Sequence, residues 1–400
     1  MSDRYQFNAL RNVTDIAFDE KFLRIFYPVE KSNVDAAILK HCRRLLSLDS
    51  VRPYYALMPD FHPGEENVIG SVIPTVDTIL LCQIGGDIGC GMLFLPLGVM
   101  RESIEPFLDE IFTALQKVIP TGTSYNVHIN ERVKGLPILD REFRAPFRGS
   151  SFRKTLMAQT GTLGGGNHFL EIQADEHGGT GIMIHSGSRF LGVRTRDHYV
   201  KKSLEMAGNA PAKLPALPAG SEEGSDYLHD MGLVMDYSRE NRLEMLHRAL
   251  EVISGFVEIP SRSLSENLVD CTHNYARMET HFGEELLIHR KGATSAFQGE
   301  PGIIPGSMGT SSYIVEGRGY PFSFMSCSHG AGRKYSRGDS MRRLSDHEFR
   351  KSMKGIVADT GSKRKDEAPA AYKNIKDVMK YQSECVKIVR TMRPLLVVKG

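Results

Sequence analysis

Residues 82–92, with the sequence C-Q-I-G-G-D-I-G-C-G-M, place a carboxylate and a thiol in one glycine-rich turn. The turn follows the apolar residues 78–81, which are typical of a buried strand. Its glycines permit positive φ angles and close approach, so Asp87 and Cys90 can be held at one point. Thiolate and carboxylate are both anionic metal ligands. Taken alone, such a motif is more often a tight structural turn with an inert, buried cysteine.

Three histidines occur in comparable settings further along the chain. They are His168 in G-T-L-G-G-G-N-H-F-L-E (residues 161–171), His185 after the apolar residues 181–184, and His273 in D-C-T-H-N-Y (residues 270–275). Glycine-rich loops can bind phosphate through converging backbone N–H groups, but residues 161–171 match neither the Walker nor the dinucleotide-binding pattern. A lone histidine is more often a hydrogen-bonded core residue. Three of them, added to the Asp/Cys turn, predict a metal site instead.

His329 follows the short apolar segment 324–328 and begins the sequence H-G-A-G-R. The small residues after it allow a phosphate to approach closely, and Arg333 can neutralise its charge. A buried structural histidine would explain the strand but not the glycines and the arginine. Residues 333–365 then contain eleven basic and four acidic side chains, a net charge of +7. Such a run is usually a solvated face, but its position after His329 favours contact with phosphate.

Helices and short strands must position these groups. Apolar periodicity predicts helices over residues 103–119, 235–257 and 375–389, and composition predicts a surface loop over residues 206–225. Asp60 and His62 would share one side of the chain only if their segment is extended. Lys399 ends the apolar strand 395–398 and would be frayed unless something binds it. The pattern indicates a mixed α+β fold, although it does not give the strand order.

The composition is that of a soluble globular enzyme, with 41% hydrophobic and 24% charged residues. Fifty basic against 48 acidic residues leave a net charge of only +2, so any contact with nucleic acid must come from a local patch. The six cysteines form no CxxC pair, which predicts reduced thiols in a cytoplasmic protein. The chain begins without an apolar leader pattern and has no run of membrane-spanning length, so neither secretion nor membrane insertion is expected.

Ten motifs occur in an order that resembles one family, the RtcB-type RNA ligases. They are MPDFHPG, GGDIGCGM, GTLGGGNHFLEI, HSGSR, HNYA, HRKGAT, GIIPGSMGTSSYIV, SHGAGRKYSR, EAPAAYK and RPLLVVKG. The similarity extends from about residue 58 to residue 400, with gaps near 125–155 and 205–235. It implies that residues 1–400 form one RtcB-like α+β domain, with sheets packed centrally and helices outside.

The resemblance also implies roles for particular residues. Asp87, Cys90, His168, His185 and His273 would bind two metal ions, with the Cys90 thiolate bridging them. His329 would be the nucleophile that carries GMP. The guanosine nucleotide of GTP would contact Asn167, His168, Phe169, Leu170, Glu171, His273, Asn274, Pro305, Gly306, Ser307, Met308, Ser312, His329, Gly330, Ala331, Gly332 and Lys399. The family uses Mn²⁺, whereas ligand softness alone would favour Zn²⁺ for a Cys/His/Asp set.

By the same resemblance, the substrate is RNA with a 3′-phosphate or 2′,3′-cyclic-phosphate end and a 5′-hydroxyl end, in RNA repair or tRNA splicing. Because arginine binds phosphate bidentately, we expect RNA phosphates to be held by basic residues within the motifs. These candidates are Arg189, Arg290, Lys291, Arg333 and Arg337. Glu171 can accept hydrogen bonds from a guanine edge. A monomer is expected, and an archease-type activator is a candidate partner.

The chain departs from the family pattern at several positions. Glu65 and Glu66 stand where lysine and glycine are usual, Phe190 stands where glycine is usual, and C-T-H-N replaces a paired histidine. These changes remove no expected ligand, but they bear on substrate preference. They leave two alternatives: a paralogue that guanylylates RNA 3′-phosphate ends and seals them poorly, and a non-catalytic RNA-binding paralogue. The intact His329, Cys90 and Lys399 argue against the second.

Overall fold

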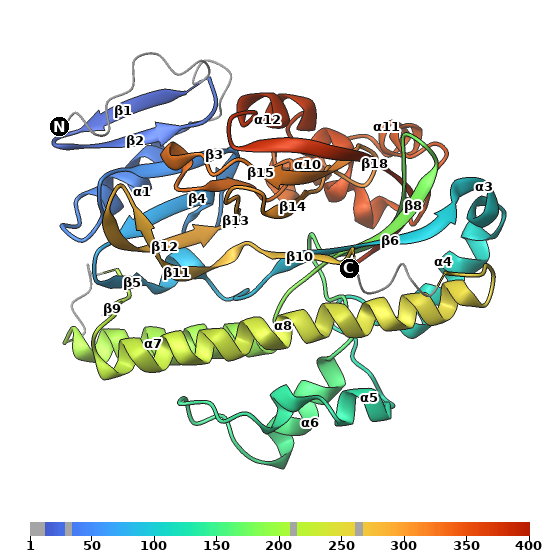
Figure 1. Cartoon of the computed structure of the whole chain (residues 1–400), viewed down its shortest axis with the longest axis horizontal. Coiled ribbons are helices and arrows are strands. Elements are labelled where there is room, and N and C mark those ends of the chain that lie inside the picture. Colours follow the sequence, from blue (N-terminus) through green and yellow to red (C-terminus); the bar gives the residue numbers. More distant parts are fainter. Residues whose placement is uncertain (1–12, 29–33, 209–213, 261–266) are drawn as a thin grey trace.

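The structure is a computed structural model that describes residues 13–28, 34–208, 214–260 and 267–400. Two large β-sheets form the centre of its mixed α+β fold (Figure 1). The larger sheet has the strand order β10-β6-β8-β7-β18-β15-β14, with β17 beside β18. Its strands are β6 (Gly91–Met100), β7 (Phe169–Asp175), β8 (Gly179–Ser186), β10 (Val269–Thr272), β14 (Pro301–Ile304), β15 (Ser312–Gly317), β17 (Val357–Ala358) and β18 (Val386–Lys399). Neighbouring strands are antiparallel except for β17 and β18.

The second sheet has the order β1-β2-β3-β4-β12-β11. Its strands are β1 (Thr14–Phe18), β2 (Lys21–Ile25), β3 (Tyr55–Pro63), β4 (Val68–Thr75), β11 (Asn274–His281) and β12 (Glu284–Lys291). Two short pairs complete the strands: β5 (Thr78–Leu80) with β9 (Ala216–Pro218), and β13 (Ala293–Ser295) with β16 (Ser326–Ser328). Only β2 and β3 pair in parallel in the six-stranded sheet.

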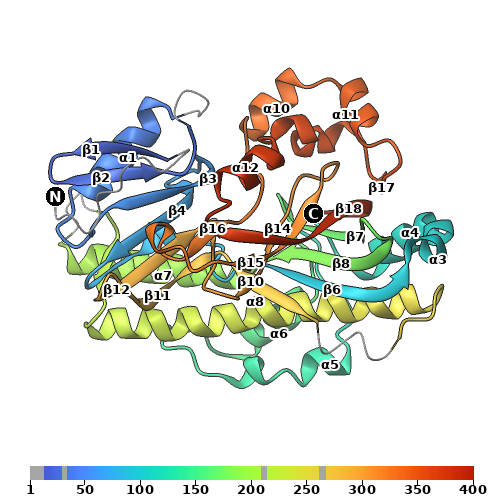
Figure 2. The ribbon, with the colours of Figure 1, turned by 45° about the horizontal axis from the view of Figure 1, so that its top comes forward.

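Helices cover both sides of the sheets. They are α1 (Ala36–Leu46), α2 (Leu81–Ile84), α3 (Arg101–Ile104), α4 (Leu108–Val118), α5 (Glu131–Lys134), α6 (Ser150–Gln159), α7 (Phe190–Met206), α8 (Glu222–Ser254), α10 (Arg337–Arg343), α11 (Asp346–Ser352) and α12 (Ile375–Tyr381). The helices α7 and α8 run together along one side, with α5 and α6 beyond them (Figure 1). On the opposite side, α10 and α11 project above the large sheet (Figure 2).

Apolar side chains bury the large sheet against α4 and α8. Leu95 and Ile182 from the sheet, Ile111 from α4, and Ala249 and Ile253 from α8 are all fully buried in one cluster. Burial of this kind stabilises the fold by roughly 25 cal/mol per Å² of apolar surface. It also fixes the large sheet, and with it the strand ends described below.

Three predicted elements differ from the structure. The helix predicted over residues 103–119 begins at Arg101 and is interrupted by a 3₁₀ turn (Glu105–Phe107), because Pro106 cannot continue the α-helical hydrogen bonds. The predicted helix 235–257 is the end of the 33-residue α8. That helix begins inside the predicted loop 206–225, where Ser221 caps it through the backbone N–H of Gly224.

The third prediction, a helix over residues 375–389, is wrong after Tyr381. The chain turns there and enters β18, which pairs with β7 and β15. Ile388 and Val389 are 46% and 50% exposed, so they do not form the buried face of a helix. Both are β-branched residues, which favour strands. Among the described residues, no helix combines the length and the apolar character that a bilayer span requires.

Candidate metal and nucleotide site

Four of the predicted ligands lie at the ends of adjacent strands. Cys90 precedes β6, His168 precedes β7, His185 is near the end of β8, and His273 follows β10. These strands are neighbours in the order β10-β6-β8-β7. Gly91 pairs with both Ser186 and Thr272, and His185 pairs with Phe169. The antiparallel register therefore brings the four side chains together, and the glycine-rich turn adds Asp87.

The donor atoms form two groups that share one thiol. Cys90, His185 and His273 form one group, and Asp87, Cys90 and His168 form the other, with all donor atoms of a group within 4.8 Å of one another. Cys90 Sγ lies 3.3 Å from His185 Nε2 and 3.5 Å from His168 Nε2. His168 Nε2 is 3.3 Å from the Asp87 carboxylate. Cys90 is thus the only described residue common to both groups.

Backbone contacts turn the imidazoles toward the centre of the cluster. His168 Nδ1 lies 2.9 Å from the Leu163 carbonyl, and His185 Nδ1 lies 3.3 Å from the Asn167 carbonyl. An Nδ1–H that donates to a carbonyl leaves the Nε2 lone pair free for a metal. Burial lowers the pKa of His185 and of His273 well below the ordinary histidine value, so both rings are neutral, as ligands must be.

The chemistry of the cluster fits a bound cation. Burial and the Asp87 carboxylate raise the pKa of the Cys90 thiol well above its usual value, so a positive ion is needed to hold it as a thiolate. His185 Nε2 and His273 Nε2 approach to 3.2 Å, and His273 Nδ1 is buried without a hydrogen-bond partner among the described residues. A cation between His185 Nε2 and His273 Nε2 would bind the lone pairs that otherwise face one another.

His329 is held by a buried carboxylate next to this cluster. Its Nδ1 lies 2.6 Å from Asp60 Oδ2, and the same oxygen accepts the backbone N–H groups of His329 (3.1 Å) and Gly330 (3.3 Å). Asp60 is fully buried. Burial raises its pKa, but the neighbouring His329 and His62 outweigh this and lower it. The His329 ring centroid is 4.9 Å from that of His273.

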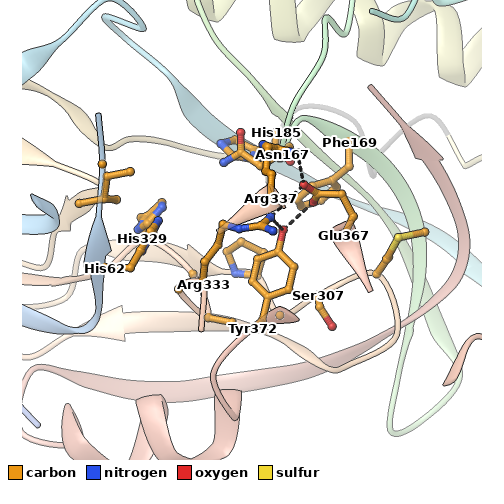
Figure 3. A pocket seen from close by; sticks show the side chains of 18 of the residues that line it. His62, Asn167, Phe169, His185, Ser307, His329, Arg333, Arg337, Glu367 and Tyr372 are labelled. Carbon is orange, nitrogen blue, oxygen red and sulfur yellow. Dashed lines mark hydrogen bonds and ion pairs between the residues drawn. The ribbon is translucent and has the colours of Figure 1, made fainter. Parts of the chain in front are cut away.

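A cavity of about 560 Å³ opens in front of His329 (Figure 3). Twelve of the predicted nucleotide contacts line it: Asn167, Phe169, Glu171, Pro305, Gly306, Ser307, Met308, His329, Gly330, Ala331, Gly332 and Lys399. Gly332 has a φ of +71°, and a Cβ there would collide with the Asp60 carbonyl at 1.9 Å, so only glycine fits.

The other predicted nucleotide contacts lie behind the cavity wall. Leu170 is fully buried in the apolar core. Ser312 accepts from the Gly306 N–H at 3.1 Å and from the Gln173 amide at 3.2 Å. Asn274 donates to the Asp87 carbonyl at 2.9 Å. His168 and His273 belong to the cluster of candidate metal ligands. These five residues shape the site without lining the cavity.

The structure separates the predicted RNA-phosphate contacts into different environments. Arg290 is fully buried and forms a bidentate pair with Glu279, with contacts of 2.6 and 3.0 Å, so its guanidinium cannot reach RNA. Lys291 donates to the Ile84 carbonyl at 2.9 Å. Arg189 packs against Gly164 beside the metal cluster. Arg333 and Arg337 line the cavity.

Sequence reasoning missed an acidic and aromatic group at the far end of the cavity. Glu367 contacts Lys399 Nζ at 2.8 Å, Arg337 at 2.7 Å and the Tyr372 hydroxyl at 2.5 Å. Figure 3 shows Glu367, Tyr372 and the two arginines facing one another. Glu367 and Tyr372 lie in the EAPAAYK motif and Asp60 lies in MPDFHPG, so the motifs contained the signal, but none of the three residues was assigned a role in the site.

The chain matches the family model described as tRNA-splicing ligase RtcB over residues 41–148 and 140–400. It belongs to the RtcB family. It is 34% identical over 372 residues to the RNA-splicing ligase RtcB of Escherichia coli (strain K12), covering 87% of this chain and 90% of that protein. It is 31% identical to the RNA-splicing ligase RtcB of Mycobacterium tuberculosis (strain ATCC 25618 / H37Rv), covering 88% and 97% of the two chains. The tRNA-splicing ligase RtcB of Methanococcus maripaludis is 28% identical, covering 92% of each chain. The resemblance seen in the motifs is therefore confirmed, and the RtcB fold is consistent with the mixed α+β architecture.

Proposed function

We propose that this RtcB-family protein is a GTP-dependent ligase that joins RNA 3′-phosphate or 2′,3′-cyclic-phosphate ends to 5′-hydroxyl ends. As a member of a family of RNA-splicing ligases, the chain is an RNA-joining enzyme. The observation that supports the detailed reaction is the His329–Asp60 pair, which lies beside the metal cluster at the wall of a cavity of about 560 Å³.

His329 is built to act as a nucleophile through Nε2. Because Nδ1–H donates to Asp60, the lone pair is on Nε2. That lone pair attacks the α-phosphorus of GTP, the N–P bond forms, and the bond to the bridging oxygen breaks as pyrophosphate leaves. The imidazole becomes cationic in the adduct, and the buried Asp60 carboxylate stabilises this charge without reorganising.

The remaining steps transfer GMP to RNA and then release it. An oxygen of the RNA 3′-phosphate attacks the GMP phosphorus, the N–P bond breaks, and His329 returns to its neutral form. This gives an RNA(3′)pp(5′)G intermediate. The 5′-hydroxyl of the second RNA end then attacks the 3′-phosphorus, loses its proton, and displaces GMP. Lys399 and Arg337 line the cavity, and we expect them to bind the anionic groups of these intermediates.

The five-residue cluster would hold two Mn²⁺ ions, with Asp87, Cys90 and His168 around one and Cys90, His185 and His273 around the other. Bound divalent ions at this place supply positive charge that stabilises phosphoryl oxygens. We propose guanine recognition by Glu171, which lines the cavity and is 3% exposed. Burial raises the pKa of Glu171 to about 7, so its carboxyl group can donate or accept hydrogen bonds near neutral pH.

All six cysteines are free thiols, which supports a reducing, cytoplasmic location.

One observation favours the alternative of an enzyme that caps RNA ends and seals them poorly. Glu65 lines the cavity, and a carboxylate there repels a second RNA phosphate. The proposed ligase converts the RNA(3′)pp(5′)G intermediate into joined RNA, whereas the alternative enzyme stops at that intermediate.

Labelled GTP and Mn²⁺ test the proposal. The wild-type protein should form a covalent GMP adduct that acid destroys and alkali spares, as expected of a phosphoramidate. The variant His329→Ala should form no adduct, yet should still seal RNA that carries a pre-formed 3′-ppG end. An adduct that persists in His329→Ala contradicts the proposed nucleophile. Accumulation of RNA(3′)pp(5′)G without joined product would favour the capping alternative.

A further inference from the structure

The buried amide of Gln173 lies behind Glu171, the cavity residue for which guanine recognition is proposed. Both residues are on β7, two positions apart, so their side chains lie on the same face of the large sheet. Gln173 is fully buried, and its Nε2 donates to Glu171 Oε2 at 2.5 Å. The other carboxylate oxygen, Oε1, makes no hydrogen bond within the described part of the chain. Glu171 therefore has one oxygen held from behind and one left for a ligand in the cavity.

The second N–H of the same amide reaches across the sheet. Gln173 Nε2 also donates to Ser312 Oγ at 3.2 Å. Ser312 begins β15, and β18 lies between β7 and β15, so this hydrogen bond crosses an entire strand. Ser312 Oγ in turn accepts the Gly306 N–H at 3.1 Å, and residues 305–308 line the cavity. Gln173 thus connects two parts of the cavity wall, Glu171 and the loop 305–308.

Packing alone does not explain a glutamine at this position. Gln173 Oε1 is buried and has no hydrogen-bond partner among the described residues. A buried polar atom without a partner destabilises a fold, and an apolar side chain of similar size would avoid this loss. What an apolar side chain lacks is the pair of N–H donors on Nε2. The hydrogen bonds to Glu171 and Ser312 are therefore the features that distinguish Gln173 from a core residue.

An amide donor favours the form of Glu171 that suits guanine. Burial raises the pKa of Glu171 to about 7, and the hydrogen bond from Gln173 and the charge of Lys399 oppose this rise. An ionised carboxylate has about four acceptor positions, of which Gln173 occupies one. Guanine offers two adjacent donors, its N1–H and its 2-amino group, whereas adenine has a lone pair at N1 and no donor beside it. A fixed, ionised Glu171 therefore matches guanine and repels adenine.

We propose that Gln173 is a positioning residue for nucleobase selection, which holds Glu171 in place and couples it through Ser312 to the loop 305–308. The inference rests on the proposed function, because it takes Glu171 as the residue that binds guanine. It assigns the choice of GTP to a connected group of buried hydrogen bonds, in which Gln173 acts on the base without touching it. Loss of Gln173 should therefore reduce discrimination between purines more than it reduces the chemistry at His329.

The test measures formation of the covalent nucleotide adduct with GTP and with ITP, which keeps the N1–H but lacks the 2-amino group. Wild type should have an apparent affinity about tenfold higher for GTP than for ITP, the effect of one hydrogen bond to a charged group. In Gln173→Met, which keeps the size of the side chain but removes both donors, this ratio should fall to about two. The labelling rate at saturating GTP should change much less than the affinity. Thr180→Val is the matched control: Thr180 is buried in β8 of the same sheet, donates to the Val99 carbonyl at 2.7 Å, and does not line the cavity.

A second variant, Ser312→Ala, removes the other end of the connection and decides the matter if Gln173→Met does not fold. It should lower the ratio of GTP to ITP affinity about threefold, because Glu171 keeps its own bond to Gln173. A wild-type ratio in whichever of the two variants folds would overturn the proposal. An equal loss of affinity for GTP and ITP would also overturn it, because that result indicates a purely structural role.

The variant Glu171→Gln separates this inference from the proposed function. It should lose the preference for GTP over ITP, because an amide cannot accept both guanine donors. A preference that survives in Glu171→Gln, or a wild-type protein without any preference, would contradict guanine recognition by Glu171 and this inference with it. If Glu171→Gln loses the preference and Gln173→Met keeps it, only the role of Gln173 is wrong.

Discussion

The Asp60 carboxylate accepts three hydrogen bonds through one oxygen, from the ring of His329 and from the backbone N–H groups of His329 and Gly330. Asp60 lies in β3, at a register shift between Leu57 and His62 where β3 leaves its regular pairing with β4. Lys373 donates to the carbonyls on either side of Asp60, those of Pro59 (3.0 Å) and Phe61 (2.6 Å). A strand irregularity thus directs the Asp60 carboxylate at His329.

The variant Asp60→Asn should slow formation of the GMP adduct on the order of a hundredfold. An amide keeps the shape of the side chain, but it neither favours the Nε2 lone pair nor stabilises the cationic adduct. The rate of GTP labelling in a single turnover measures this step directly. Asp109→Asn, at an exposed position of α4, is the matched control. Labelling of Asp60→Asn at the wild-type rate would remove Asp60 from the mechanism.

The two groups of metal-donor residues predict that substitutions in them remove different amounts of bound metal. Cys90 belongs to both groups, whereas His273 belongs to one. Purified Cys90→Ala should therefore retain little Mn²⁺, and His273→Ala should retain about half of the wild-type amount. Cys82→Ala serves as control, because Cys82 is not in either group. Metal content by elemental analysis decides the matter, and full stoichiometry in Cys90→Ala would exclude a bridging thiolate.

Lys399 is buried and points into the cavity from the end of β18, where it contacts Glu367. Lys399→Met should weaken GTP labelling at least tenfold by losing a charge-assisted hydrogen bond. Lys399→Met is a better test than deletion of Lys399 and Gly400, because the Gly400 N–H donates to the His168 carbonyl at 3.0 Å and the deletion would remove this hydrogen bond as well. Lys117→Met, at an exposed position of α4, controls for loss of charge. Equal apparent affinity for GTP in the variant and wild type would contradict this role.

Glu367 predicts a dependence of stability on pH. Burial raises its pKa, but Lys399 and Arg337 outweigh this and bring it to about 2, below the ordinary value of 4.5. A lowered pKa in the folded state means that the ionised group stabilises the fold above pH 4.5, and that this contribution is lost as the pH falls toward 2.

At pH 7, Glu367→Gln should therefore be destabilised by about 3–5 kcal/mol, because it leaves Lys399 buried without its partner. The difference from wild type should shrink between pH 4.5 and 2. Urea unfolding at several pH values measures it, with the exposed Glu110→Gln as control. A difference that stays constant between pH 4.5 and 2 would show that the pKa of Glu367 is not lowered in the folded protein.

The residues of the candidate site could be predicted from the sequence because they follow from residue types and short spacings. Asp87 and Cys90 in one turn, histidines at strand ends and glycines after His329 are local features. The amphipathic pattern also predicted part of the long helix α8, but not the residue at which this helix begins. The helix predicted beyond Tyr381 failed because apolar residues at short spacing fit a strand as well as a helix, and pairing with β7 and β15 decides between them.

Only the tertiary structure decided which residues meet. Arg290 and Arg337 are both arginines within a motif, yet Arg290 is buried against Glu279 and Arg337 lines the cavity. Asp60 and His329 are 269 positions apart, and no local pattern pairs them. The strand order β10-β6-β8-β7 brings four separate motifs together into one cluster of candidate metal ligands. Sheet register depends on the packing of the whole chain, because each pairing is stabilised by apolar contacts contributed from distant segments.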